Sequence, residues 1–307
     1  SPILNPILSL ILKYISEERE KLKLKKAFSS YVSAEIVNII SDNESELALQ
    51  GEKRELTVLF SDIRNFTTYS EQSNPHEIIS FLNTYLTSMT DVIFKFSGTV
   101  DKFMGDGIMV IFGAPVNHTD HATKACFTAL SMISELDHIN SGRMNEAPVK
   151  IGIGINTGIM TVGNIGSDKK FDYTVIGDSV NLGARLESLN KNLNTNIIVS
   201  EFTRKQVSEE FFLFRELGRV KVKGKAQDVL IHELMNYRKN ENQYSEYLSE
   251  YNTALALYKA HDFRAAIKKF EAARQLREND VISNKYLELC KECLINQDTY
   301  TETIYTA

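Results

Sequence analysis

Apolar and polar positions along the middle of the chain follow two different patterns. Residues 54–63 form a short, mostly apolar run that is typical of a buried strand. Residues 75–96 and 119–140 have the length and composition of helices, and Pro75 stands in the first turn of its segment, where proline is favoured. The central part of the chain is therefore expected to alternate strands with helices.

Two apolar runs, TVDKFM and IMVIFG, flank a glycine-rich turn at Gly105, Asp106 and Gly107, which predicts a β-hairpin. A second strand pair is expected over residues 149–166, and a helix over 178–190. Further strands are expected at 197–200, 212–217 and 219–234. This order of elements predicts an α+β fold of the ferredoxin-like βαββαβ kind. We expect helices on one face of a mainly antiparallel sheet, with the other face left for a partner or a ligand.

Helical patterns flank this central part on both sides. Residues 1–50 carry one apolar helical face, which suits either a plain amphipathic helix on the core or a dimerising helix that relays an upstream signal. Residues 239–307 resemble one tetratricopeptide repeat, with small residues spaced so that paired helices can approach closely. One repeat cannot bury its own apolar face, so it must pack on the central body or on another chain. Three parts are thus expected: 1–50, 51–238 and 239–307.

Composition narrows the class of protein. The 307 residues are 43% hydrophobic with a net charge of −5, which argues against nucleic acid as a partner. Three cysteines provide no disulfide framework and suit a reducing, cytoplasmic compartment. Cys290 and Cys293 form a C-x-x-C within a helical pattern, and we interpret them as buried helical cysteines. The chain does not begin with Met, so an upstream sensor or membrane module remains compatible with it.

Two carboxylates occupy the ends of strands. Asp62 ends the first apolar run, and Asp106 lies at the tip of the hairpin. Either residue alone could be a turn residue that caps its own backbone. Two carboxylates that converge from adjacent strands favour a hard cation such as Mg²⁺ or Mn²⁺. Two such ions, ~3.5–4 Å apart, can hold the attacking and leaving oxygens of a displacement at phosphorus.

Other polar residues suggest how a phosphate would be held. The loop after Asp62 leads into a helix, where backbone N–H groups and the Thr67 hydroxyl can contact phosphate oxygens. Asn181 and Arg185 are one helical turn apart, so both point to the same side. Arginine offers a planar, permanently charged fork for a phosphorus centre. No Walker motif or dinucleotide fingerprint occurs in the chain, so any phosphate must be bound by a different arrangement of residues.

The segments FSDIRNFT, VDKFMGDGIMVIFG, YTVIGDSVNLGARLE and VKGK together resemble the catalytic domain of class III adenylyl cyclases, over residues 51–238. The resemblance implies metal binding by Asp62, Asp106 and the backbone carbonyl of Ile63, with two divalent ions. It also implies contacts to the substrate ATP from Phe66, Thr67, Lys102, Gly105, Thr174 and Lys223, and to its ribose and α-phosphate from Asn181 and Arg185.

The resemblance further implies conversion of ATP to cyclic AMP and pyrophosphate. Lys102 would donate to an adenine ring nitrogen, and Thr174 would contact the exocyclic amine; guanylyl cyclases have Glu and Cys at these places. Because the family's sites form between two subunits and this chain holds the full set, a homodimer is expected. The Thr174 variant is similar to the branch that includes bicarbonate-responsive cyclases, which makes bicarbonate a candidate effector.

Three alternatives stand beside this interpretation. A catalytically silent cyclase-like module is disfavoured because the metal aspartates and the arginine are all present. A diguanylate cyclase is disfavoured because the GGDEF-type signature is absent. His118 and His121 have a spacing that metal sites use, but a helix begins beside them, so we interpret them as helix-entry residues.

Overall fold

The computed structural model describes Lys13, Arg19 and residues 51–72, 74–143, 147–167, 170–221 and 228–306. Apart from Lys13 and Arg19, the helix expected over residues 1–50 lies outside the described residues, as does the candidate phosphate contact Lys223. No helix in the described part of the chain is both long and apolar enough to cross a bilayer.

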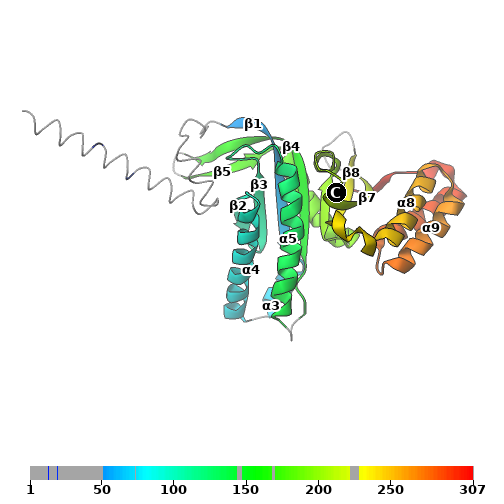
Figure 1. The fold of residues 1–307 in the computed structure, drawn as a ribbon, viewed down its shortest axis with the longest axis horizontal. Coiled ribbons are helices and arrows are strands. Elements are labelled where there is room, and N and C mark those ends of the chain that lie inside the picture. Colours follow the sequence, from blue (N-terminus) through cyan, green and yellow to red (C-terminus); the bar gives the residue numbers. More distant parts are fainter. Residues whose placement is uncertain are drawn as a thin grey trace, which may run out of the picture.

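The described secondary structure follows the expected alternation and then adds a helical end (Figure 1). The strands are β1 (Glu52–Ile63), β2 (Thr99–Met104), β3 (Gly107–Phe112), β4 (Ile151–Ser167), β5 (Lys170–Ile176), β6 (Ile197–Ser200), β7 (Phe212–Lys221), β8 (Val229–Tyr237) and β9 (Thr303–Thr306). The α-helices are α3 (Phe66–Gln72), α4 (Pro75–Lys95), α5 (His121–Ser141), α6 (Asp178–Leu193), α7 (Glu201–Arg204), α8 (Ser245–Lys259), α9 (Phe263–Leu276) and α10 (Val281–Ile295). Short 3₁₀ helices occupy Arg238–Gln243 and Gln297–Thr299.

The strands form one mixed sheet in the order β2-β3-β1-β4-β6-β8-β7-β9, with β5 paired to β4. Strand β1 is central and runs antiparallel to both neighbours, with Ser61 opposite Ile108 of β3 and Asp62 opposite Gly152 of β4. The β2–β3 hairpin turns at Gly105, whose φ of +70° is easy only for glycine. This register places the hairpin tip beside the end of β1.

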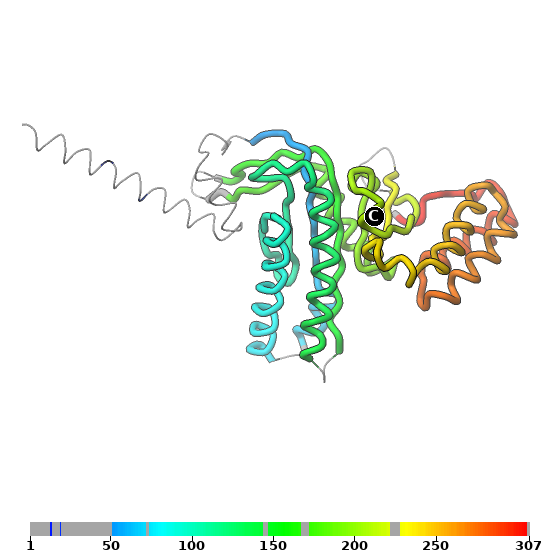
Figure 2. The backbone as a smooth tube through the Cα atoms, in the orientation of Figure 1, coloured from blue at the N-terminus to red at the C-terminus, as the bar shows by residue number. Residues whose placement is uncertain are grey.

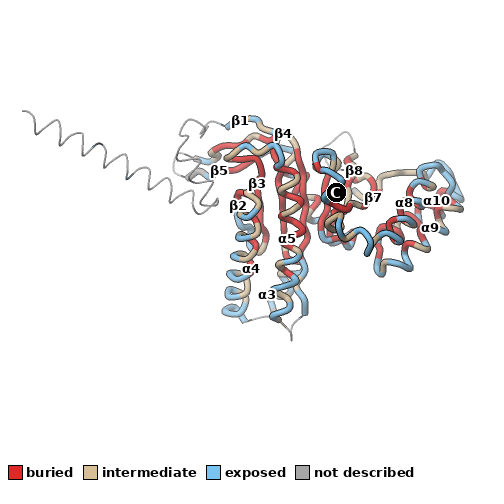
Figure 3. Tube along the Cα trace, viewed as in Figure 1, coloured by how far each residue is buried: buried red, intermediate tan, exposed pale blue. Residues whose placement is uncertain are grey.

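Helices α4 and α5 cover one face of the sheet. Leu59 and Ile63 of β1 share one core with Tyr85 of α4 and Ala125 of α5. The alternate β1 residues, Leu56, Val58 and Phe60, point to the opposite face and belong to a separate core. The central strands are accordingly buried along most of their length (Figure 3). This alternation with period two is the pattern of a strand enclosed from both sides.

The opposite face is less open than the sequence suggested, because α6 packs directly on β4 and β1. Gly154 makes the approach possible: a Cβ at this position would lie 2.1 Å from the backbone nitrogen of Glu187 and 2.4 Å from the carbonyl oxygen of Gly183. A Cβ on Gly183 would in turn meet Val58 at 2.9 Å. Backbones can come this close only where both elements lack side chains. The exposed part of this face is therefore confined to the end of the sheet near β2, β3 and β5.

The C-terminal helices share a core with the sheet. Leu217 of β7 and Ile231 of β8 pack in one cluster with Tyr251 of α8 and Tyr286 of α10. The last segment then runs back from the helices to the sheet, where β9 pairs in parallel with β7 (Figure 2). The sequence pattern missed this strand. The likeness of α8 and α9 to a tetratricopeptide repeat stays a prediction, as do the three domain boundaries.

A buried ionic network joins the sheet to these helices. Arg215 of β7 is 1% exposed, and its guanidinium lies 2.8 Å from both a Glu233 oxygen on β8 and an Asp280 oxygen at the start of α10. Arg277 makes two further hydrogen bonds to Glu233, at 2.7 and 2.9 Å. Every charge in the network therefore faces an opposite one, which a buried charge requires.

Replacing Arg215 by Met is expected to lower the free energy of unfolding by about 3–5 kcal/mol, because Glu233 and Asp280 lose their shared partner in the interior. Urea unfolding followed by circular dichroism measures this change. Lys259→Met is the matched control, since its pair with Glu216 is partly exposed and such pairs contribute about 1 kcal/mol or less. Equal losses in the two variants would contradict the role of the network.

Candidate active site

Asp62 and Asp106 lie together at the end of β1 and the tip of the β2–β3 hairpin. The backbone N–H of Ile63 donates to Oδ2 of Asp106 at 3.1 Å, which links the two elements directly. Gly107 belongs to the same close packing, because a Cβ there would lie 3.4 Å from Oδ1 of Asp62. The two strand-end carboxylates predicted from the sequence are thus brought together.

Asp62 and Asp106 are two acids crowded together at a partly buried place. Burial, the hydrogen bond to Asp106 and the charge of Asp106 together raise the pKa of Asp62 to about 7. Glu187 of α6 adds to this effect. Carboxylates crowded in this way are stabilised by a bound divalent cation, which replaces mutual repulsion with attraction.

Glu187 is a neighbour of the pair that the sequence analysis did not single out. Its pKa is raised to about 7, chiefly by burial and also by the charge of Asp106, while the Ser188 hydroxyl and Arg64 oppose the rise. Arg64 follows Ile63 in the chain, and its guanidinium donates to the Thr195 carbonyl. Glu187 stands two residues after Arg185 in YTVIGDSVNLGARLE. The sequence could therefore place Glu187 on α6, but it could not predict that Glu187 lies near the end of β1.

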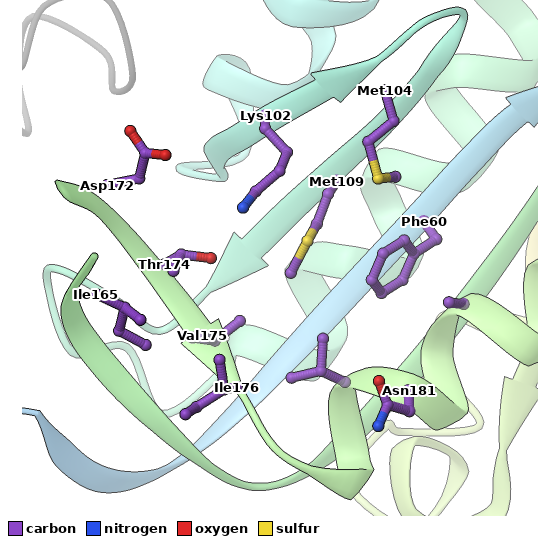
Figure 4. Close-up of a pocket in the computed structure, with 12 residues that line it drawn as sticks. Phe60, Lys102, Met104, Met109, Ile165, Asp172, Thr174, Val175, Ile176 and Asn181 are labelled. Atoms are coloured by element: carbon purple, nitrogen blue, oxygen red, sulfur yellow. The ribbon is translucent and has the colours of Figure 1, made fainter. Parts of the chain in front are cut away.

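A pocket of about 470 Å³ opens on the exposed part of the opposite face (Figure 4). Lys102 of β2, Thr174 of β5 and Asn181 of α6 all line it. The polar ends of Lys102 and Thr174 point into the space between the hairpin and β5, Asn181 lies at the edge by the start of α6, and Phe60 and Met109 also line the pocket. A partly apolar pocket with a few polar groups suits an aromatic ring such as a nucleobase.

Arg185 lies one turn after Asn181 on α6, as its spacing predicted, and is half-buried. Asn181 is exposed. Neither Arg185 nor either of the paired aspartates lines the pocket. Within one chain, the structure therefore assembles two separate groups: the carboxylate pair, and the pocket with Lys102, Thr174 and Asn181.

The remaining predicted residues lie around the carboxylate pair. Phe66 and Thr67 are the first two residues of α3, directly after the end of β1, and Gly105 forms the hairpin turn before Asp106. Asn65 precedes α3 with a φ of +57°, which reverses the chain between the strand and the helix. The carbonyl of Ile63 belongs to the same short segment as Asp62.

Comparison with known proteins identifies the same part of the chain. The model of the adenylate and guanylate cyclase catalytic domain family matches residues 49–238. The terminal-differentiation-specific adenylate cyclase of Dictyostelium discoideum is 31% identical over 274 residues, covering 87% of this chain and 13% of that protein. Three curated adenylate cyclases match the chain, and the chain spans less than half the length of each of them.

Solved structures give the same result. The guanylyl cyclase Cya2 is 38% identical with a TM-score of 0.56, covering 62% of this chain and 97% of that structure. The adenylyl cyclase CyaB from P. aeruginosa is 35% identical with a TM-score of 0.58, covering 62% of this chain and 98% of that structure. Neighbours of both base specificities therefore share the fold, so the choice of base must depend on individual side chains.

Proposed function

The chain belongs to the adenylate and guanylate cyclase catalytic domain family, and on that premise we propose that it converts ATP to 3′,5′-cyclic AMP and pyrophosphate. The observation that carries this proposal is the arrangement of two sets of groups. A crowded carboxylate pair stands at the end of β1, and a base-sized pocket lined by Lys102, Thr174 and Asn181 opens beside the same hairpin.

Asp62 and Asp106 fit divalent metal ions, together with the carbonyl of Ile63. The described residues include no group of three or more acidic, His or Cys side chains that would cage a metal alone. Mg²⁺ commonly needs only one or two carboxylates when substrate phosphates supply further ligands. Two bound ions, Mg²⁺ or Mn²⁺, would neutralise charge on the triphosphate and activate the ribose 3′-hydroxyl.

The protein's own groups would position the reacting atoms. Asn181 would hydrogen bond the ribose, so that the 3′-oxygen faces the α-phosphorus in line with the leaving pyrophosphate. Arg185 would place its guanidinium against the α-phosphate, where negative charge develops as the new bond forms. The N-terminal residues of α3, Phe66 and Thr67, with Gly105 and Lys223, would hold the phosphate chain.

Lys102 and Thr174 would select the base. Lys102 would donate a hydrogen bond to a ring nitrogen of adenine, and the Thr174 hydroxyl would accept one from the 6-amino group. Guanine presents a protonated ring nitrogen and a carbonyl at the corresponding places, so the lysine would face a donor. ATP is therefore the substrate that this pocket favours.

The catalytic unit would be a homodimer in which each site takes the carboxylate pair from one protomer and the pocket from its partner. Two apolar residues that line the pocket support this arrangement, since Met104 of β2 is 48% exposed and Ile176 of β5 is 52% exposed. Apolar side chains grouped beside a pocket are typical of a surface that a partner covers.

Incubation of the purified chain with ATP or GTP and Mn²⁺, with the product identified by mass spectrometry, tests the proposal. We expect cyclic AMP from ATP and at least tenfold slower formation of cyclic GMP from GTP. Formation of cyclic GMP as the main product would refute the choice of base, and the absence of both cyclic products would refute the activity.

Bicarbonate is proposed as an effector on the Thr174 variant alone. The same assay, repeated with bicarbonate at constant pH and ionic strength, decides this point. Unchanged turnover would remove the effector from the proposal and leave the cyclase activity untouched.

A further inference from the structure

Asp101 is a buried carboxylate directly beside the base pocket, and the proposed mechanism assigns it no role. Its side chain is fully shielded from solvent, whereas that of its neighbour Lys102 is 43% exposed. The ammonium of Lys102 lies 3.3 Å from Oδ2 of Asp101. A buried carboxylate raises the free energy of the fold unless nearby groups stabilise its charge, so the groups that surround Asp101 must explain its burial.

A β-bulge explains how two adjacent residues interact. In the pairing of β2 with β3, Val100 faces Val110 and Lys102 faces Met109, so Asp101 has no partner on β3. Regular strands point neighbouring side chains to opposite faces. The extra residue breaks this alternation and re-aims the side chains, as bulges beside active sites commonly do. Asp101 and Lys102 can therefore converge.

Thr174 is the second group that meets Asp101. Burial raises the pKa of Asp101, and hydrogen bonding from the Thr174 hydroxyl, followed by the charge of Lys102, opposes the rise. Neither carboxylate oxygen has a fully formed hydrogen bond within the described residues. A buried carboxylate oxygen without a complete hydrogen bond favours the nearest donor. The hydrogen of the Thr174 hydroxyl can rotate toward Asp101 and supply that hydrogen bond.

We infer that Asp101 is a positioning residue for base selection: it takes the hydroxyl hydrogen of Thr174 and holds the ammonium of Lys102, so that Thr174 offers the base only lone pairs. A threonine hydroxyl left to itself can donate or accept, and would tolerate either a 6-amino group or a 6-carbonyl. A hydroxyl whose hydrogen is already engaged accepts from an amino group and opposes a carbonyl. Discrimination between adenine and guanine would thus depend on a residue that never touches the base. This inference rests on the proposed use of ATP.

Asp101→Asn tests the inference with little change in volume, because the amide can donate to Thr174 and release its hydroxyl hydrogen. The ratio of kcat/KM for ATP to that for GTP is expected to fall fivefold or more. Asp91→Asn is the matched control: Asp91 is an exposed acid on α4 that does not line the pocket, and the ratio should stay within twofold. A change below fivefold in Asp101→Asn would overturn the inference, whatever the absolute activity.

Thr174→Val provides a second test that does not depend on the folding of an Asp101 variant. If the hydroxyl presents only lone pairs, its removal lowers use of ATP and leaves use of GTP unchanged or improved. A parallel loss with both nucleotides would show that the hydroxyl donates freely, and would overturn the inference.

Equilibrium binding of 3′-deoxy-ATP and 3′-deoxy-GTP, which lack the attacking hydroxyl, separates this inference from the proposed function. A preference for the adenine analogue that depends on Asp101, in a protein that forms no cyclic product, would leave the inference standing and refute the activity. Cyclic AMP formation with a base preference that is independent of Asp101 would support the activity and refute the inference.

Discussion

Asp106→Asn is expected to lower kcat for cyclic AMP formation by about 10³-fold or more, since bound metal ions supply several kcal/mol of charge stabilisation and each ~1.4 kcal/mol is a factor of ten in rate. The amide keeps the size of the side chain and an oxygen that can accept from the N–H of Ile63. It removes the negative charge that raises the pKa of Asp62, so the crowding that favours a cation disappears.

Steady-state turnover at saturating ATP over a series of Mn²⁺ concentrations measures this loss, and excess metal should not restore activity. Asp91→Asn is a suitable control, because Asp91 is an exposed acid on α4 and its replacement leaves the pair intact. Retention of more than a tenth of the activity in Asp106→Asn would mean that this aspartate holds no essential ion.

Mixing two inactive variants is expected to recover activity. Arg185→Ala alone should lose about 10²–10³-fold in kcat, as removal of a transition-state charge partner commonly does. In a dimer of Asp106→Asn with Arg185→Ala, one site keeps both its carboxylate pair and its arginine, while the other site loses both. Random pairing makes half of the dimers mixed, so about a quarter of the wild-type turnover should return.

Subunit exchange followed by the cyclic AMP assay measures the recovery. The matched control is a mixture of Asp62→Asn with Asp106→Asn, in which both sites of every dimer carry a damaged carboxylate pair, so no activity should return. A mixture of Asp106→Asn with Arg185→Ala that only averages its components would show that each chain builds its own site, and the shared-site model would fail.

Several positions of the candidate site could be placed from the sequence because local rules govern them. A strand end and a hairpin turn fixed where Asp62 and Asp106 would emerge, and helical spacing placed Asn181 and Arg185 on one side of α6. Gly105 was expected in the turn, where its positive φ is found. The helix begun by Pro75 and the β2–β3 hairpin were also as expected.

Other contacts could not be predicted from such local rules. Alternation along a strand places Asp101 and Lys102 on opposite faces, yet the bulge in β2 brings them together. Arg215 has the sequence features of a surface cation, yet it is buried at the junction with the C-terminal helices. The terminal strand β9 follows a helical zone and forms by pairing with the distant β7.

The chain's periodicity and turn residues by themselves determined which elements form, their order and the residues at their ends, because side-chain direction and backbone conformation depend on near neighbours. The tertiary structure alone decided which of these residues meet. It placed Glu187 beside the carboxylate pair, Thr174 beside Asp101, and the C-terminal helices on β7 and β8. Such meetings depend on sheet register, on a bulge and on close glycine contacts between residues far apart in the chain, which no local pattern encodes.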